Sequence, residues 1–321
     1  MFQDMQPVRG ISTDCLQDMI ITLCNYWNRD YELAFSETMG FNFIWAEDKL
    51  IGECVTNSRT TSFDLLQDYH GVAVQEHIFP TSHDVFKMIT ASLENRQAIL
   101  IQLDSFWNPW GNAHAYQQEH NYHHACLVVG VEKDQTDLYC VDSTFSNQIE
   151  RLPIDHFFQG NNGRAATIER IAPVHTDLSE AYGRIRTSVI QDNHYEAFYD
   201  LADAFEKKMN LDQEIAGCHE LWDAPIFQKI DTIYFGRNYH SKALQYLASH
   251  NPLPSLHKTL EALLPLASRL AIQWEITQKN LIKYYYVNTA GKDAIYRPKI
   301  AGIIRENAKL EEEFFNLYRL A

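Results

Sequence analysis

The stretch that decides the fold is "EHNYHHACLVVGVEKDQTDLYCVD", residues 119–142. The apolar runs "ACLVVGV" (125–131) and "DLYCVD" (137–142) are short and rich in β-branched residues, and the polar turn "EKDQT" separates them, so the pattern predicts a β-hairpin. His124 leads into the first strand and Asp142 ends the second. In such a hairpin the two side chains can lie side by side on the sheet.

Working outward, residues 1–172 mix helices and strands. The segment "CLQDMIITLCNYW" (15–27) has the apolar spacing of an amphipathic helix, and Asp14 precedes it as a capping residue with Gln17 three positions on. A second capped helix is predicted over 82–94. Alternating or apolar segments predict strands at 41–45, 72–78, 98–103 and 166–171. This half is predicted to be an α+β domain in which a helix packs against an antiparallel sheet.

Residues 173–321 have the pattern of helices only. Apolar residues recur at steps of three, four and seven along 255–286, and again along 297–320. Pro265 lies inside the first of these helices, so a kink or a break is expected there. The chain is therefore predicted to form an α+β domain over 1–172 and an all-α domain over 173–321.

Composition excludes several classes. The chain has 321 residues, 45% of them hydrophobic, which indicates a globular protein rather than a disordered one. Its net charge of −15 disfavours non-specific binding to nucleic acid. The start "MFQDMQPVRG" has no secretory pattern, and no apolar run reaches the ~20 residues of a membrane-spanning helix. The six scattered cysteines fit a reduced, cytoplasmic protein with no membrane partner.

Three residues form the catalytic hypothesis. Cys15 is expected in the first turn of a helix, where unpaired N–H groups and the helix dipole favour a thiolate, although Asp14 and Asp18 oppose it. A histidine oriented by a carboxylate can accept the thiol proton, so His124 and Asp142 complete a Cys–His–Asp arrangement. Taken singly, each has an ordinary structural explanation: a buried small side chain, a loop-bonded histidine and a turn-forming aspartate.

A metal site is the competing chemistry. The segment "HAYQQEHNYHH" contains His114, Glu119, His120, His123 and His124, which are enough ligands for zinc. Their spacing matches no HExxH or HxH pattern, and the segment has the character of a loop. The prediction is that no metal is bound.

The chain also carries a family resemblance over its first ~170 residues. The segments "DCLQDMIITLCNYW", "MGFNFIW", "AILIQLDSFWNPWGN", "HHACLVVGV" and "LYCVD" follow one another in order. Together they resemble the N-terminal domain of the butirosin biosynthesis protein H family, which has a papain-like, bacteriocin-peptidase-like cysteine fold. The resemblance implies Cys15 as the nucleophile, His124 as the base and acid, and Asp142 as the orienting carboxylate.

One position departs from this pattern. Papain-like enzymes usually carry an oxyanion-stabilising glutamine about six residues before the cysteine. Arg9 occupies that position here, and the nearest upstream glutamine is Gln6. The backbone N–H of Cys15 remains as an oxyanion donor.

The resemblance implies an acyltransferase of secondary-metabolite or antibiotic biosynthesis. Cys15 would take an acyl group from a thioester, on an acyl carrier protein or another donor, and pass it to a small amine acceptor. No cofactor is expected to be bound, with phosphopantetheine only on the donor. A homo-oligomer is left open. The loop 104–123 is expected to wall the substrate pocket, or equally to pack against the helical domain, through Asp104, Trp107, Trp110, Tyr116, Tyr122 and His123.

Two further points complete the expectations. A carrier protein is usually acidic, so its docking would need basic residues, and Lys283, Lys292, Arg297 and Lys299 are the best candidates, unless they form an ordinary solvated helix end. The alternatives to acyl transfer are a cysteine peptidase or thioesterase with the same triad, and a non-catalytic binding protein.

Overall fold

The computed structural model describes residues 2, 4–8, 14–57, 61–111, 115–122, 124–175, 177–250, 254–287 and 293–320. It is a mixed α+β structure with an antiparallel sheet, as predicted. The chain divides into two compact units, Met1–Tyr31 with Phe63–Thr176 and Glu32–Ser62 with Asp177–Ala321. Each unit is described by itself.

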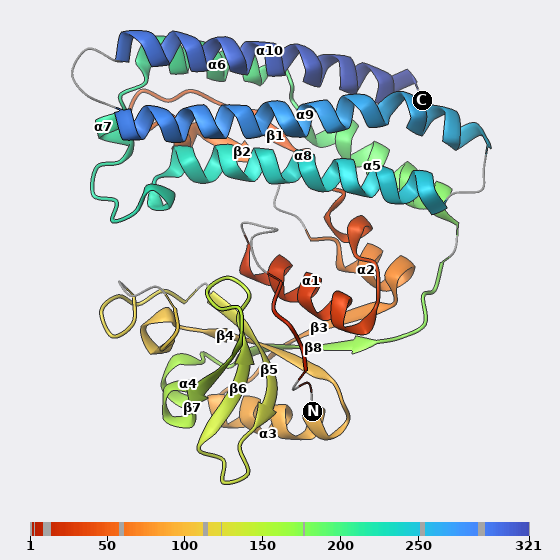
Figure 1. The fold of residues 1–321 in the computed structure, drawn as a ribbon, viewed down its shortest axis with the longest axis vertical. Coiled ribbons are helices and arrows are strands. Elements are labelled where there is room, and N and C mark those ends of the chain that lie inside the picture. The colour runs from red at the N-terminus through yellow and green to blue at the C-terminus, as the bar shows by residue number, and fades with distance from the viewer. Residues whose placement is uncertain are drawn as a thin grey trace. The chain divides into compact units, whose positions relative to one another are not determined.

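The first unit is built on a six-stranded sheet (Figure 1). Its strand order is β3-β8-β4-β5-β6-β7, and every neighbouring pair is antiparallel. The strands are β3 (Val72–Ile78), β4 (Ala98–Leu103), β5 (His124–Val131), β6 (Asp137–Val141), β7 (Ile149–Pro153) and β8 (Arg164–Arg170). The predicted hairpin is confirmed, because β5 and β6 pair antiparallel, and the continuous apolar run of β5 is buried on both faces of the sheet.

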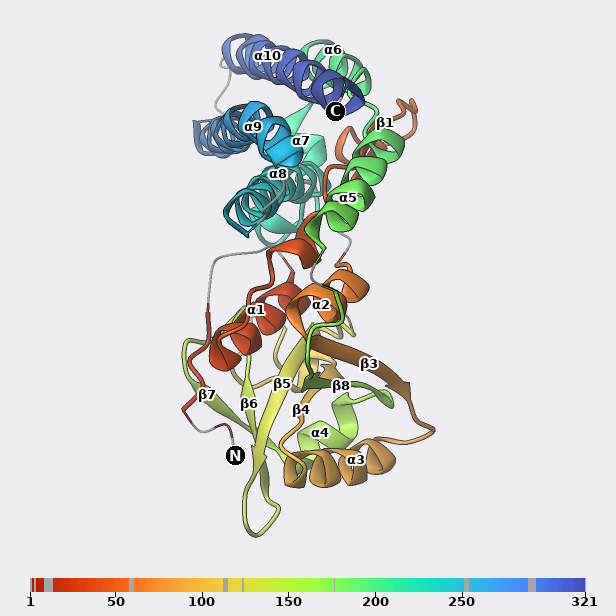
Figure 2. The same cartoon turned by 90° about the vertical axis from the view of Figure 1, so that its right-hand side faces the viewer.

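Helices cover both faces of this sheet (Figure 2). Helix α1 (Cys15–Trp27) packs on β5 from one side, whereas α3 (Ser82–Glu94) contacts β4, β5 and β8 from the other. On the α3 side, apolar residues of the strands pack with Val85 and Ile89 of α3 and with Phe157 of α4 (Ile154–Gly160). Both predicted helices, at 15–27 and 82–94, are present with those bounds.

Three elements of this unit were not predicted. They are α2 (Phe63–His70), β7 and α4. Strand β7, "IERLP", is half-exposed and ends in a proline, which weakens its apolar alternation. Its pairing with β6 supplies the stabilisation that its own sequence pattern lacks.

The second unit is helical apart from a two-stranded ladder and short turns of 3₁₀ helix. Its long helices α8, α9 and α10 pack in succession, and α6 packs on α10. Helix α9 continues through Pro265 as one element, so the expectation of a break there is wrong. The helices are α5 (Leu178–Asp192), α6 (Ala197–Lys208), α7 (Leu211–Glu214), α8 (Pro225–His250), α9 (Pro254–Val287) and α10 (Asp293–Leu320).

Residues 32–62 belong to the second unit, which differs from the predicted boundary. The segment holds β1 (Phe41–Phe43) and β2 (Val55–Asn57), a separate antiparallel pair. Phe41 stacks on Phe198 of α6 with ring centroids 3.5 Å apart, so the apolar face of β1 is buried among helices rather than in the large sheet. The alternation at 41–45 identified a strand correctly but could not identify its partner.

Within the described part of the chain, no helix is long and apolar enough to cross a membrane.

Candidate active site

Cys15 begins helix α1, as the sequence predicted. Asp14 is the N-cap, and its Oδ1 accepts a hydrogen bond from the Leu16 backbone N–H at 2.8 Å. The Cys15 side chain is half-buried and lines a pocket. The helix start therefore gives Cys15 both a fixed position and access to a ligand.

Side-chain contacts fix α1 against the loop that follows β6. Thr22, two turns along the helix, forms a hydrogen bond with Ser143 at 2.7 Å between their hydroxyl oxygens. Ser143 directly follows Asp142, and both are fully buried. This contact sets the distance between the helix that carries Cys15 and the loop that carries Asp142.

His124 and Asp142 form a buried pair. His124 Nε2 lies 2.6 Å from Asp142 Oδ2, with 6% and 0% of the two side chains exposed. A carboxylate accepts, so Nε2–H donates and Nδ1 is left for Cys15. Burial opposes protonation of His124, but its hydrogen bonds with Asp142 and Cys15 outweigh burial and raise its pKa from 6.5 to about 9.

Asp142 is kept ionised in the same way. Burial raises the pKa of Asp142. The hydrogen bond with His124 and the positive charge of His124 lower this pKa by more, so it lies below its ordinary value. The imidazolium–carboxylate form of the pair is therefore the favoured one at neutral pH. The His124 ring is also covered by Phe145, with ring centroids 5.1 Å apart.

Two side chains from the loop after β4 hold Asp142. Trp110 Nε1 donates to Asp142 Oδ2 at 2.8 Å, and Asn108 Nδ2 donates to the same oxygen at 3.3 Å. The other oxygen, Oδ1, accepts from the backbone N–H groups of Thr144 and Phe145 at 3.2 and 3.3 Å. Asp142 thus both binds His124 and forms the turn of the structural alternative, and its role as an orienting carboxylate stays a prediction.

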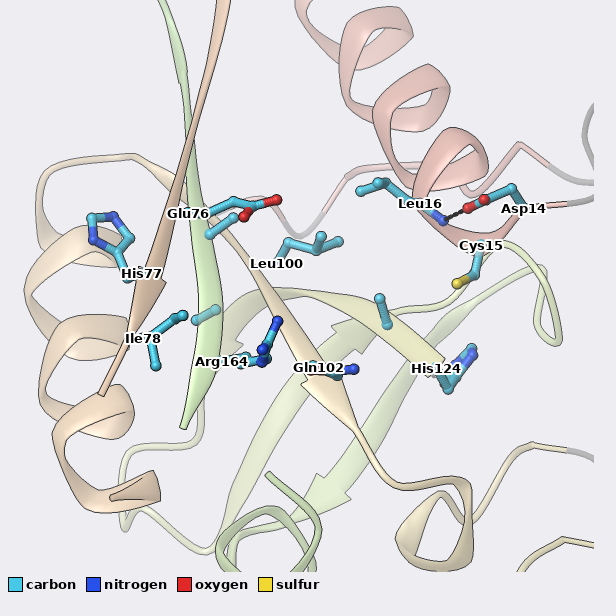
Figure 3. Close-up of a pocket in the computed structure, with 13 residues that line it drawn as sticks. Asp14, Cys15, Leu16, Glu76, His77, Ile78, Leu100, Gln102, His124 and Arg164 are labelled. Carbon is cyan, nitrogen blue, oxygen red and sulfur yellow. Dashed lines mark hydrogen bonds between the residues drawn. The ribbon is translucent and has the colours of Figure 1, made fainter. Parts of the chain in front are cut away.

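A pocket of about 310 Å³ opens beside Cys15 and His124 (Figure 3). Its floor comes from one face of β3, β8, β4 and β5, because Glu76 pairs with Ala166, Ala166 with Leu100, and Gln102 with Ala125. Directly paired residues share a face of the sheet. The lining residues are Asp14, Cys15, Leu16, Glu76, His77, Ile78, Leu100, Gln102, His124, Ala125, Arg164, Ala165 and Ala166.

Of the six predicted pocket residues, the five that the structure describes lie elsewhere. His123 is outside the described residues, and the other five do not line this pocket. Asp104 is buried, caps the turn at Ser105–Trp107, and accepts from His120 at 2.5 Å. Trp110 binds Asp142 and does not line the pocket.

The remaining aromatic residues of that loop pack locally. Trp107 and Tyr116 both lie against the ring of His156, and the half-exposed Tyr122 stacks on His120. The described residues of this loop are thus not among the lining of the pocket beside Cys15, and their contact with a substrate stays a prediction. The loop begins where β4 ends, and its side chains Asn108 and Trp110 donate hydrogen bonds to the Asp142 carboxylate.

Sequence reasoning missed the residues that do line the pocket. Glu76, Gln102 and Arg164 stand on predicted or partly predicted strands, and each interrupts an otherwise apolar or small-residue face. A polar residue that interrupts an apolar face indicates a pocket residue, but the face can be recognised only when the strand order is known. Strands β3 and β8 are neighbours although about 90 residues separate Glu76 from Arg164 along the chain.

The positions considered for an oxyanion donor lie only partly within the described residues. Arg9, which occupies the expected glutamine position, lies outside the described residues, and Gln6 is exposed and does not line the pocket. The backbone N–H of Cys15, at the start of α1, stays the predicted donor.

The histidine-rich segment is used for pairing in the described structure. His120 binds Asp104 and His124 binds Asp142, while His114 and His123 lie outside the described residues. Over the residues that are described, no three metal-ligating side chains gather at one place. The absence of a bound metal remains a prediction.

The predicted basic residues near the α9–α10 connection are only partly described. Lys283 and Lys299 are exposed, Arg297 donates to the Met209 carbonyl at 3.1 Å, and Lys292 is outside the described residues. Arg297 therefore has a structural role, and docking of a partner at the two lysines stays untested.

The other thiols are less suited to chemistry. Cys24, Cys54, Cys126 and Cys140 are buried, and the hydrogen bond with Cys140, together with burial, raises the pKa of Cys126 well above its usual value. Cys218 is half-buried like Cys15, but burial and the nearby Asp223 raise its pKa. Among the six, Cys15 is the one that lines the pocket beside His124.

Comparison of the chain with protein-family models finds no matching family, and comparison with curated proteins finds no match.

Proposed function

We propose that this protein is a cysteine acyltransferase that forms an amide, or an ester, from a thioester donor. The observation that carries the proposal is that Cys15, at a helix N-terminus, and His124 line one pocket, while the buried carboxylate of Asp142 binds His124. A nucleophile, a base in reach and a third group that orients the base are the parts that acyl transfer needs. The papain-like fold and the likeness to the butirosin biosynthesis protein H family are part of this proposal.

The first half-reaction would load the enzyme. The Cys15 thiolate attacks the thioester carbonyl, and the backbone N–H of Cys15 donates to the developing oxyanion. The C–S bond to the donor then breaks, and the His124 imidazolium gives its proton to the departing thiolate. The products are an acyl-Cys15 thioester and a free thiol, which is the phosphopantetheine arm if the donor is an acyl carrier protein.

The second half-reaction would transfer the acyl group from Cys15 to the amine. Neutral His124 accepts a proton from the amine as its nitrogen attacks the acyl-Cys15 carbonyl, and the Cys15 thiolate leaves. The amide is released, and the imidazolium and thiolate are restored. Asp142 stays ionised throughout and holds Nε2–H, so that Nδ1 faces the sulfur and the acceptor.

Intact-protein mass spectrometry tests both halves. Incubation with an acyl-pantetheine thioester should add the mass of the acyl group to the wild-type protein and nothing to Cys15→Ala. The adduct should persist in water and disappear much faster when a small amine is added, with the amide appearing in solution. Adducts on Cys15→Ala, or none on wild type with acyl-pantetheine thioesters of different chain length and charge, would overturn the proposal.

Hydrolysis by the same three residues is the second candidate, since an acyl-enzyme is common to both reactions. It would be the better description if water removed the adduct as fast as every amine tested.

A further inference from the structure

The loop after β4 supports both partners of the His124–Asp142 pair. It joins β4 to β5, and β5 begins at His124. Asn108 and Trp110, near the start of the loop, donate hydrogen bonds to Asp142 Oδ2 at 3.3 and 2.8 Å. The position of this loop therefore affects His124 through the chain and Asp142 through two hydrogen-bond donors.

A buried carboxylate closes the base of the loop. Asp104 Oδ1 accepts from the backbone N–H groups of Phe106 and Asn121 at 3.1 and 2.8 Å, and Asp104 Oδ2 binds His120 Nδ1 at 2.5 Å. The Ser105 N–H also donates to the Asn121 carbonyl at 2.9 Å. These bonds join the residues that begin the loop to those that end it.

His120 holds this closure from its solvent side. Its ring lies nearly parallel to the ring of Phe106, with centroids 4.3 Å apart, and 55% of its side chain is exposed, against 1% for Asp104. Burial raises the pKa of the Asp104 carboxyl, but the hydrogen bonds with His120 and with the two backbone N–H groups lower this pKa by more. Asp104 is therefore ionised, and its oxygens are costly to bury without donors.

A short turn connects the closure to Asp142. The 3₁₀ turn Ser105–Trp107 has Asp104 as its N-cap and ends at Asn108, whose backbone N–H donates to the Ser105 carbonyl at 3.1 Å. Asn108 is fully buried. A shift of Asp104 would therefore move the side chains that hold the Asp142 carboxylate.

We propose that Asp104 and His120 are positioning residues for the reaction at Cys15. By closing the base of the loop, this pair keeps the Trp110 indole on Asp142. Neither residue lines the pocket beside Cys15, so both act through the loop. This inference rests on the proposed function and adds to it the groups that fix the carboxylate beside the histidine.

Three variants separate the hydrogen bond from the ring that makes it. His120→Phe keeps a ring that can stack but removes the donor, so the loop should open until water reaches Asp104 Oδ2. His120→Asn retains an N–H donor close to the place of Nδ1 and should behave like the wild type. His83→Phe is the matched control, because the exposed ring of His83 lies nearly parallel to that of Phe158, with centroids 4.2 Å apart, outside this loop.

The indole N–H signal of Trp110 in nuclear magnetic resonance reports the effect without any substrate. A hydrogen bond to a carboxylate should shift this proton downfield of ordinary indole protons, and its absence from Trp110→Phe identifies it. In His120→Phe the signal should move to the ordinary range, and the proton should exchange with water about tenfold faster. His120→Asn and His83→Phe should keep the wild-type signal. An unchanged signal in His120→Phe, or the same shift in His83→Phe, would overturn the proposal.

Alkylation of Cys15 by iodoacetamide shows whether the effect reaches the sulfur. At pH 6 an ordinary thiol is almost entirely protonated, so the rate depends on the thiolate that His124 stabilises. His120→Phe should react about fivefold more slowly, and His120→Asn should restore the rate. Adding Trp110→Phe should slow His120→Phe by less than it slows the wild type, because both changes act on Asp142. Equal rates in the wild type and His120→Phe, or losses that multiply in full, would contradict the positioning role.

These measurements separate failure of this inference from failure of the proposed chemistry. Each variant is compared after circular dichroism has shown that it is folded. Slower alkylation of His120→Phe, with no loading of the wild type by acyl-pantetheine thioesters, would refute acyl transfer and retain the positioning role. Loading of the wild type, with the alkylation rate and the indole signal unchanged in His120→Phe, would refute the positioning role and retain acyl transfer.

Discussion

Two histidines of this protein are almost equally buried and have opposite acid–base behaviour. His124, in the first unit, has its pKa raised to about 9, whereas the pKa of His240, in the second unit, is lowered to about 4. Burial acts in the same direction on both, because it disfavours the charged imidazolium. The neighbouring groups decide the outcome.

His240 has only neutral hydrogen-bond partners. Its Nδ1 lies 2.8 Å from the Ser36 carbonyl oxygen, which can only accept, so Nδ1 carries the proton and Nε2 accepts from the Tyr318 hydroxyl at 2.8 Å. The charge of Arg237 also disfavours a second proton. His124 instead faces the ionised Asp142. A buried histidine thus favours the charged form when its partner is ionised and the neutral form when its partners are neutral.

The largest expected difference between the two is in catalysis. His124→Ala should slow acyl transfer roughly 10²–10⁴-fold, because the group that moves protons is lost. His240→Gln should leave the rate per folded molecule unchanged. Acylation rates from mass spectrometry, corrected for the folded fraction by circular dichroism, measure both. Similar losses in the two variants would mean that His124 acts only through the fold.

The next difference is in the pH dependence of stability. His240 has a pKa of about 4 in the folded protein and 6.5 in the unfolded chain, so the unfolded chain binds a proton first as the pH falls. The free energy of unfolding therefore decreases between pH 6.5 and pH 4, by a total of about 3 kcal/mol. His124 has a folded pKa of about 9, above 6.5, so its contribution is complete below pH 6.5 and is lost as pH rises through 9.

Urea unfolding at pH 5, 7 and 9 measures these opposite slopes. His240→Gln should remove part of the loss at pH 5, and His124→Gln should remove part of the loss at pH 9. His219→Gln, at an exposed histidine, is the control and should follow the wild type. The same pH profile in all three variants would contradict the assignment of the two pKa values.

The smallest expected effect comes from the support of Asp142. Trp110→Phe keeps the ring but removes the Nε1–H donor, while Asn108 still binds the same carboxylate oxygen. We expect about a tenfold loss in kcat with little change in KM, since one charge-assisted hydrogen bond is lost at a residue that does not line the pocket. Steady-state kinetics beside Trp222→Phe, a half-exposed tryptophan of the second unit, measures it. A rise in KM with kcat unchanged would return Trp110 to the role of a pocket residue.

Local patterns were enough where one segment decides its own structure. The cap at Asp14, the start of α1 at Cys15 and the strands β3 and β4 follow from residues that are neighbours in the chain, and the structure has them at the predicted bounds. His124 and Asp142 could be paired from the sequence because one hairpin turn brings them together. Trp110 was predicted to line the pocket from the aromatic composition of its loop, and composition does not show where the indole N–H points.

What the sequence by itself determined is therefore the helices at 15–27 and 82–94, the strands β3 and β4 and the β5–β6 hairpin, and with them the places of Cys15, His124 and Asp142, because alternation and capping act over a few residues. Only the tertiary structure decided the neighbours of each element. Strand order brings Glu76 beside Arg164, the loop after β4 carries Trp110 to Asp142, and packing on α6 assigns β1 to the helical unit. It also gave the two histidines their different partners, and a buried group takes its pKa from the charges that the fold places around it.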